Sequence, residues 1–246
     1  MRKMWRIGID EAGRGPVIGP LVVGALLIPE SDEQLLKDAG ITDSKLLSKE
    51  KREELDAWIR VTAEERGWKF ALHTSLPAEI DWAMMATNLN DHEVSLFAKL
   101  ACQLRPEKGV GILQVDACDA DARRFGNNVA TQLVGWPWEG WSIDSRHGAD
   151  LYLLTVGAAS ILAKVARDRA IEDISAELGI DVGSGYPSDA KTIAAISKLI
   201  EGEVPHTSLR WKWATVNNAW QEKYGVPVPS RPREGVIPQT AQRTLF

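Results

Sequence analysis

Two short apolar segments that each run into an aspartate constrain the fold of this chain more than any other feature. Residues 4–10 alternate apolar and polar side chains, and residues 111–116 form a short apolar run; both patterns are typical of β-strands. Residues 48–66, 91–104 and 158–178 instead carry apolar side chains at helical spacing. Strands interspersed with long helices predict an α/β domain with a mixed central sheet flanked by helices.

Further segments complete the expected secondary structure. Residues 17–28 predict a second, largely apolar strand, whose glycines and Pro20 favour a bulge or a close approach to a neighbour. Ser48 is placed to cap the helix that follows it. After the turn-forming sequence GSGYPSD, residues 190–200 predict a helix, and residues 211–220 are rich in tryptophan.

Composition indicates a folded protein in a reducing compartment. A chain of 246 residues with 44% hydrophobic residues can bury a substantial core. Cys102 and Cys118 lack a CxxC or His-paired spacing, so structural thiols are favoured over a disulfide. No run approaches the ~20 apolar residues that span a bilayer, and the first residues do not form a signal peptide. We therefore expect a cytoplasmic protein without a membrane partner.

Four acidic residues are the strongest candidates for chemistry. Asp10 and Glu11 follow the first strand, Asp116 ends another, and Asp150 precedes the helix at residues 158–178. Each acid alone fits a solvated turn or loop. Together they would offer the oxygen ligands that Mg²⁺ and Mn²⁺ prefer, and a pair of such ions can activate water for attack on a phosphodiester.

The net charge of −5 argues weakly against a nucleic-acid partner, because phosphate binding usually requires a basic surplus. Clustered carboxylates that hold metal ions would lower the net charge without preventing phosphate binding. Asp119 and Asp121 compete with Asp116 as candidate ligands, but they come after the strand end. The charge therefore leaves a metal-dependent nuclease open.

Several motifs together resemble one family. The segments GIDEAGRGPVIGPLVVGA, TDSK, VDACDADARRFG, HGAD, AASILAKVARDR and GSGYPSD occur in the order and approximate spacing of ribonuclease HII, from about residue 7 to residue 215. GSGYPSD and VDAxD look closer to the archaeal and eukaryotic branch. The resemblance implies a ribonuclease H-like α/β fold with a helical C-terminal part.

The resemblance also implies an activity. Matched position by position, the metal-binding acids of the family fall on Asp10, Glu11, Asp116 and Asp150, with Mg²⁺ or Mn²⁺ as cofactor. The implied reaction is endonucleolytic hydrolysis of RNA in RNA/DNA hybrids, or at a ribonucleotide within duplex DNA, leaving 3′-OH and 5′-phosphate ends. The first Asp of VDAxD is the family ligand, which favours Asp116 over its neighbours.

Substrate contacts follow from the same resemblance. Gly13, Arg14 and Gly15 correspond to the segment that contacts the 2′-OH, and glycines allow a sugar to approach the backbone closely. Tyr186 corresponds to the tyrosine that packs on the ribose, and Lys45 is a candidate phosphate ligand. The alternatives are a simple tight turn, a loop aromatic that closes a small core, and a solvated lysine.

Other positively charged and aromatic residues stay ambiguous. Lys164, Arg167 and Arg169 lie on the helix at residues 158–178 and either face nucleic acid or form a solvated face. The tryptophans of GWPWEGW, at positions 136, 138 and 141, favour core packing, with contact to a nucleic-acid strand as the alternative.

Two positions depart from the family pattern. Gly148 stands where members usually carry Lys, and Lys212 replaces a Ser in the segment resembling RxSWxT. These departures put substrate affinity and the seating of Asp150 in doubt, but they remove no metal ligand.

The chain is expected to divide into three regions. Residues 1–180 would form the catalytic core, and residues 181–224 a helical, substrate-sensing part. The prolines of residues 225–246 indicate a flexible tail. The tail ends in QRTLF, in which Gln242, Leu245 and Phe246 resemble a sliding-clamp-binding peptide, with a frayed terminus as the alternative. We expect the protein to be a monomer.

Two other functions compete with ribonuclease HII activity. One is a nuclease of the same fold that cuts only DNA or resolves junctions. The other is a non-catalytic module that binds nucleic acid or a clamp, against which the intact set of four acids argues.

Overall fold

A computed structural model describes residues 3–41 and 46–232. No helix in these two ranges is long and apolar enough to cross a membrane. The chain forms two compact units. The first comprises the residues up to Ala12, Val22–Thr74 and Asn90–Ala166, and the second comprises Gly13–Leu21, Ser75–Leu89 and the residues from Arg167 on. The expected boundaries at residues 180 and 224 remain a prediction.

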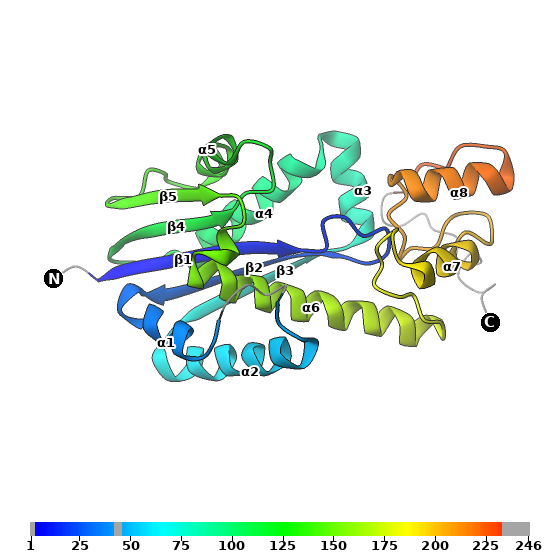
Figure 1. Ribbon diagram of the computed structural model, residues 1–246. Coiled ribbons are helices and arrows are strands. Elements are labelled where there is room, and N and C mark those ends of the chain that lie inside the picture. Colours follow the sequence, from blue (N-terminus) through cyan, green and yellow to red (C-terminus); the bar gives the residue numbers. More distant parts are fainter. Residues whose placement is uncertain (1–2, 42–45, 233–246) are drawn as a thin grey trace. The chain divides into compact units, whose positions relative to one another are not determined.

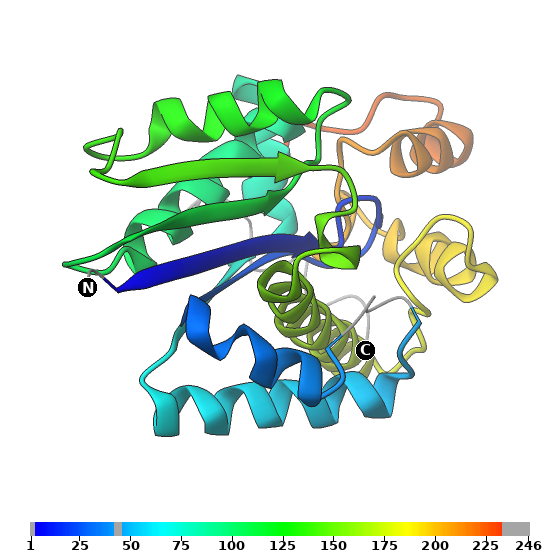
Figure 2. The ribbon, with the colours of Figure 1, turned by 60° about the vertical axis from the view of Figure 1, so that its left-hand side comes forward.

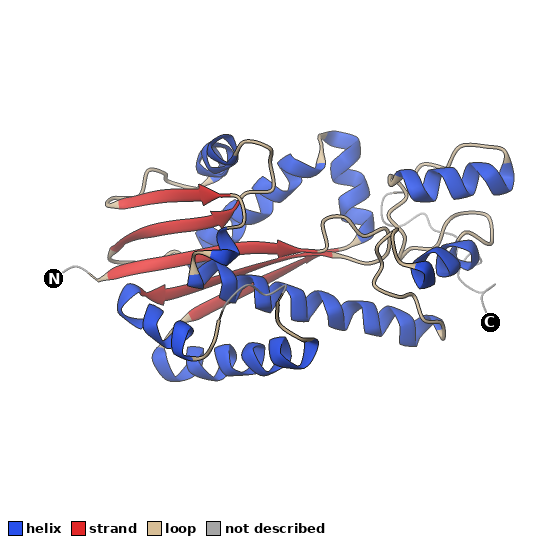
Figure 3. Ribbon diagram, in the orientation of Figure 1, coloured by secondary structure: helices blue, strands red, loops and turns tan. Residues whose placement is uncertain are grey.

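A five-stranded mixed sheet is the centre of the first unit (Figures 1 and 3). Its order is β3-β2-β1-β4-β5, with β1 parallel to β4, β4 parallel to β5 and β1 antiparallel to β2. The strands are β1 Met4–Ala12, β2 Leu21–Pro29, β3 Lys69–Ser75, β4 Val110–Asp116 and β5 Trp141–Arg146. The expected mixed α/β sheet is thus confirmed.

β1 extends two residues beyond the predicted strand end at Asp10. The prediction was wrong because β2 supplies ladder partners for the last residues of β1: Asp10 lies opposite Gly24, and Glu11 lies opposite Val23. β2 in turn begins at Leu21 rather than at residue 17. Its register against β1 continues without a bulge, so Gly24 serves the close approach that was the alternative.

Helices cover both faces of this sheet (Figure 2). One face packs against α1 Glu33–Asp38, α2 Lys49–Arg66 and the first part of α6 Leu154–Leu178. The other face carries α4 Leu89–Leu104 and α5 Ala122–Gln132, whose Phe97 and Phe125 rings meet edge to face with centroids 5.2 Å apart. Ser48 caps α2 as predicted, since its hydroxyl accepts from Lys51 N at 3.2 Å.

The glycines of β1 and β2 let α6 pack directly on the backbone of the sheet. A Cβ atom on Gly8 would lie 2.3 Å from the carbonyl carbon of Thr155, and one on Gly24 would lie 2.5 Å from Ala159 O. Neither distance is compatible with a side chain unless the helix moves. α6 is therefore held at a fixed height above β1 and β2.

The second unit has its own apolar core. It contains α3 Pro77–Ala86, α7 Ala190–Leu199 and α8 Ala214–Tyr224. Buried residues of this core include Val17, Ile18, Val182, Ile196, Leu199, Leu209, Trp211, Val216 and Trp220. The tryptophan-rich segment predicted at residues 211–220 therefore contributes to packing and continues into a helix.

A buried ion pair fixes the C-terminal part of this unit. Asp81 is fully buried; its carboxylate accepts from the Nε of Arg231 at 2.8 Å and from the backbone N–H groups of Trp211 and Lys212 at 2.9 and 3.0 Å. The backbone of Lys212 is thus anchored while its side chain is exposed. Its substitution for Ser leaves the local chain path intact.

We expect Asp81→Ala to lower the free energy of unfolding by about 3–5 kcal/mol, because it leaves the buried Arg231 guanidinium without its counter-charge. Urea unfolding measures the loss. Glu201→Ala is the matched control, because it breaks the more exposed Glu201–Lys223 pair in the same unit and should change stability by no more than about 1 kcal/mol. Equal losses of stability in the two variants would contradict a special role for the buried Asp81–Arg231 pair.

Candidate active site

The four candidate acids are all in the first unit, on adjacent parts of the sheet. Asp10 and Glu11 lie near the end of β1, and Asp116 is the last residue of β4. These parallel strands are neighbours, with Ile9 opposite Val115, so the next residues, Asp10 and Asp116, reach the same edge of the sheet. Asp150 lies in a short 3₁₀ turn, Ala149–Leu151, that follows β5.

A backbone hydrogen bond joins the turn of Asp150 to the end of β4. Ala149 N donates to Oδ1 of Asp116 at 2.9 Å. Gly148, just before this turn, has left-handed backbone angles, φ 61° and ψ 37°, which a residue with a side chain adopts less readily. The departure from the family lysine therefore suits the observed backbone, and Asp150 is buried beside it.

Electrostatic interactions show that the acids are close together. Burial raises the pKa of Asp10 well above its ordinary value, and the negative charges of Glu11 and Asp116 raise it further, with a smaller contribution from Asp150. A hydrogen bond from Ser160 on α6 acts in the opposite direction. Anionic carboxylates that destabilise one another in this way form an oxygen-rich donor set that fits a hard divalent cation.

Glu11 has a different environment from Asp10, because neighbouring residues of a strand point to opposite faces. The Sγ of Cys118 lies 3.2 Å from Oε2 of Glu11, and ligand atoms of Glu11, Glu93 and Cys118 all lie within 4.8 Å of one another. Both cysteines are free thiols. Cys118 thus borders the acidic group, and the fully buried Glu93 on α4 extends it.

The two competing acids have structural partners. Asp119 accepts from the Nε of Arg124 at 2.8 Å, and hydrogen bonding to this guanidinium lowers the pKa of Asp119 to about 2. Asp121 caps α5, since its carboxylate accepts from Arg124 N at 3.0 Å. Neither residue is among the main causes of the shift at Asp10.

The turn at residues 13–15 belongs to the second unit, where the C-terminal segment holds its carbonyl groups. Arg210 donates from Nη2 to Gly13 O at 2.6 Å and from Nη1 to Arg14 O at 2.9 Å. Trp213 Nε1 donates to Gly15 O at 3.2 Å. All three carbonyls of the turn are therefore fixed by side chains nearly 200 positions away.

Arg210 is fully buried, and burial lowers its pKa to about 9, with the positive charge of Arg167 acting in the same direction. A third hydrogen bond runs from its Nε to Gly19 O at 3.0 Å, and its guanidinium lies 4.8 Å from the ring centroid of Trp213. Sequence reasoning missed Arg210 as a site residue. Its signal was present in the RxSWxT-like segment.

Tyr186 is close to the same turn. A Cβ on Gly15 would lie 3.4 Å from Cε1 of Tyr186, so the glycine leaves room beside the ring. Tyr186 is 39% exposed, which leaves surface available for a ligand. The buried Arg167 places its guanidinium 5.3 Å from the ring centroid and donates to Ser184 O. Arg167 is therefore not part of a solvated face, whereas Arg169 is exposed.

Lys45 and the tail residues Gln242, Leu245 and Phe246 lie outside the described residues.

Comparison with known proteins gives one consistent result. The family model described as Ribonuclease HII matches residues 7–216. A ribonuclease HII of Methanosarcina acetivorans is 41% identical over 221 residues, which cover 87% of this chain and 95% of the relative. The crystal structure of the ribonuclease H2 from Pyrococcus horikoshii OT3 is similar with a TM-score of 0.76 and 33% identity, covering 89% of this chain and 98% of that one.

A structure of the PCNA:RNase HII complex from Archaeoglobus fulgidus is similar with a TM-score of 0.73 and 36% identity. The match covers 87% of this chain and 96% of that chain.

Proposed function

We propose that the clustered carboxylates of this chain hold the divalent cations needed for phosphodiester hydrolysis. This proposal starts from family membership, because the chain belongs to the ribonuclease HII family of hydrolytic nucleases. The protein is an endonuclease of RNA/DNA hybrids. The proposed ligands are Asp10, Glu11, Asp116 and Asp150. The observation that carries this assignment is the position of Asp10 and Asp116 at the same edge of the sheet, where the turn of Asp150 hydrogen-bonds to Asp116.

Mg²⁺ or Mn²⁺ held by these residues would supply Lewis-acid activation of water and neutralise negative charge at the phosphate. The residues of the chain orient the carboxylates for this task. Ala149 N fixes one oxygen of Asp116, and the Ser160 side chain hydrogen-bonds to Asp10. The products of water attack on phosphorus would carry 3′-OH and 5′-phosphate ends.

The turn at residues 13–15 is the proposed sensor of ribose. An enzyme that cuts only beside ribose must detect the 2′-OH, which is both a donor and an acceptor. The carbonyls of Gly13, Arg14 and Gly15 are held in place, which supports a preorganised backbone site. Tyr186 would pack on the sugar, and Lys45 would bind a phosphate.

The decisive experiment compares three duplexes of one sequence: all DNA, DNA with one ribonucleotide, and an RNA/DNA hybrid. We expect cleavage of the two ribose-containing duplexes in Mg²⁺ or Mn²⁺, ends of the stated chemistry, and no cleavage in EDTA. Equal cleavage of the all-DNA duplex would favour the DNA-only nuclease. Binding of hybrids without cleavage in either metal would favour the non-catalytic module.

Tyr186→Ala should reduce kcat/KM for the single-ribonucleotide duplex by about 5-fold to 150-fold, the range expected when an aromatic contact of about 1–3 kcal/mol is lost. Tyr186→Phe should keep most of the activity, because the ring remains. Steady-state kinetics measures both. Ile193→Ala removes another exposed apolar side chain of this unit and should leave kcat/KM unchanged; an equal effect there would remove Tyr186 from the substrate site.

We also propose that the C-terminal residues Gln242, Leu245 and Phe246 bind a sliding clamp, as the similar Archaeoglobus fulgidus protein forms a complex with PCNA. A Leu-Phe anchor inserted into an apolar pocket carries most of the affinity of such peptides. Phe246→Ala should weaken clamp binding at least about 10-fold in surface plasmon resonance. Thr244→Ala is the control, and equal binding by both variants would contradict the proposal.

A further inference from the structure

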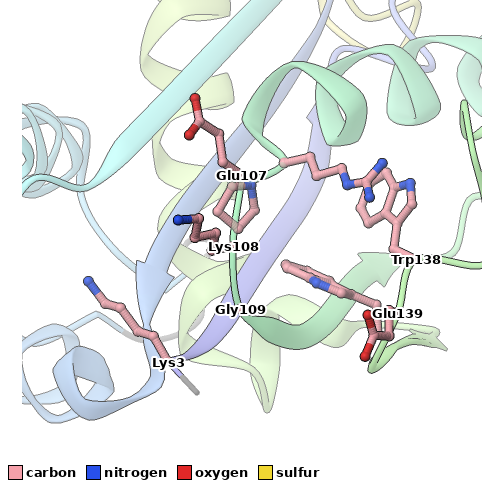
Figure 4. A pocket seen from close by; sticks show the side chains of 9 residues that line it. Lys3, Glu107, Lys108, Gly109, Trp138 and Glu139 are labelled. Carbon is pink, nitrogen blue, oxygen red and sulfur yellow. The ribbon is translucent and has the colours of Figure 1, made fainter. Parts of the chain in front are cut away.

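A cavity of about 500 Å³ opens in the first unit, at the end of the sheet away from the acids (Figure 4). Lys3 precedes β1, Gly109 precedes β4, and Trp141 begins β5, so the cavity lies at the amino ends of these three parallel strands. Its lining residues are Lys3, Arg105, Pro106, Glu107, Lys108, Gly109, Trp138, Glu139 and Trp141.

The partly exposed Trp141 supplies the aromatic wall of this pocket, and the buried Trp138 packs against it. The rings of Trp138 and Trp141 meet edge to face with centroids 5.5 Å apart, and Trp138 donates from Nε1 to Val134 O at 3.0 Å. A Cβ on Gly111 would lie 2.8 Å from the ring of Trp141. The Trp141 ring thus packs directly against the backbone at Gly111, and its position does not depend on a mobile side chain.

Positive charges surround the same space. The Lys3 ammonium lies 4.0 Å from the ring centroid of the adjacent Trp5, and the Arg105 guanidinium lies 4.7 Å from that of Trp138. Among the described residues, no ion pair joins Lys3, Arg105 or Lys108 to a carboxylate. These cations are therefore available to an anionic ligand.

Two carboxylates, those of Glu107 and Glu139, also line the pocket, so three cations exceed two anions by one charge. In Figure 4 the ammonium groups of Lys3 and Lys108 point to one side, where the Glu107 carboxylate also lies, and the Glu139 carboxylate lies on the other. An anion that approaches from the lysine side meets two ammonium groups and one carboxylate.

We propose that this pocket binds a segment of single-stranded nucleic acid, with a base against the ring of Trp141 and a backbone phosphate near the cations. Aromatic rings beside Lys and Arg are the combination that holds single strands without reading their sequence. The cavity volume falls in the range of small-ligand sites. An acidic peptide would satisfy the cations but would leave the aromatic wall unused.

The position of the pocket suggests what part of a substrate it would hold. Six residue steps along β1 separate Met4 from Asp10, or roughly 20 Å at ~3.3 Å per step. A strand in the pocket would therefore lie several nucleotides from the cut, as an unpaired extension of the duplex. This part rests on the proposed nuclease function, whereas binding of a free single strand does not.

Fluorescence anisotropy with a fluorescein-labelled dT10 oligonucleotide tests the site on the full chain. We expect Arg105→Glu with Lys108→Glu to raise Kd at least 5-fold and to reduce the slope of log Kd against log salt by roughly 1.4, for two lost phosphate contacts. Trp141→Leu should raise Kd at the same salt. The control with the same charge change is Lys49→Glu with Lys51→Glu on the exposed surface of α2, which should leave Kd unchanged.

Cleavage of a short blunt hybrid should be the same in all these variants, which separates this proposal from the proposed function. A 5-iododeoxyuridine in the oligonucleotide should crosslink to the peptide that contains Trp141. Undiminished dT10 binding by the Arg105/Lys108 variant would overturn the proposal. So would equal binding of an abasic oligonucleotide, or equally effective competition by a poly-glutamate peptide, because neither ligand offers a base.

Discussion

Asp10→Asn is expected to reduce kcat for cleavage of an RNA/DNA hybrid by about 10³-fold or more, because it removes a charged ligand from the proposed metal site. The loss should appear in kcat for hybrid and single-ribonucleotide duplexes alike. Asp119→Asn is the matched control: this acid is close in sequence but pairs with Arg124, so cleavage should stay within a few-fold of wild type. Wild-type cleavage by the Asp10 variant would exclude this residue from the site.

Stability gives a second readout of the same substitution. The pKa of Asp10 in the folded protein lies above its ordinary value, so its ionisation opposes folding. This destabilisation is fully present above the folded pKa and disappears as the pH falls below the unfolded value of about 3.9. In EDTA at pH 7, Asp10→Asn should therefore unfold at the same or a higher temperature than wild type.

Added Mg²⁺ should raise the unfolding temperature of wild type, because a ligand of the folded state stabilises it. The rise should be smaller for Asp10→Asn. Equal stabilisation of both proteins would place the bound cation elsewhere.

Arg210→Ala should lower kcat/KM for a single-ribonucleotide duplex by about 10²-fold, because it releases the carbonyls of Gly13 and Arg14 and lets the turn shift. It should also destabilise the protein by about 3–5 kcal/mol, since buried carbonyls lose their donors. Arg210→Lys should restore part of the activity, as a single ammonium can reach only some of these carbonyls.

A purely structural role for Arg210 would lower the rates on all substrates equally. A positioning role should instead reduce the preference for ribose over 2′-fluororibose at the cut site, measured as a ratio of kcat/KM values at a temperature where each variant is folded. Arg231→Ala removes another buried arginine of the same unit. It should lower stability without changing that ratio, and an unchanged ratio in Arg210→Ala would rule out positioning.

The helices and strands whose apolar residues follow a strong periodic pattern could be predicted from the sequence. β1, β4 and α2 follow directly from apolar spacing and from the Ser48 cap. β5 was missed because it is a short, partly exposed edge strand of alternating character. The true end of β1 could not be predicted either, because it depends on pairing with β2 rather than on its own residues.

The candidate site could also be predicted only in part from the sequence. Asp10, Glu11, Asp116 and Asp150 were predicted as metal ligands from motifs, and the structure places them near one another. Glu93 and Ser160 are brought to the acids by α4 and α6, within helical sequence that carries no local signal for such a role. Their proximity depends on tertiary packing, which spacing along one chain does not specify.

The two glycines beneath α6 have a consequence for how this centre tolerates change. Gly24 lies opposite Asp10 in the ladder, and Gly8 lies two residues before Asp10 on the same strand face. The height of the Ser160 hydroxyl above the sheet is therefore set by direct backbone contact between α6 and the two strands. Exchange of one aliphatic core residue for another should leave the height of the helix unchanged. One added methyl group at Gly8 or Gly24 would instead lift the helix and separate the Ser160 hydroxyl from the Asp10 carboxylate.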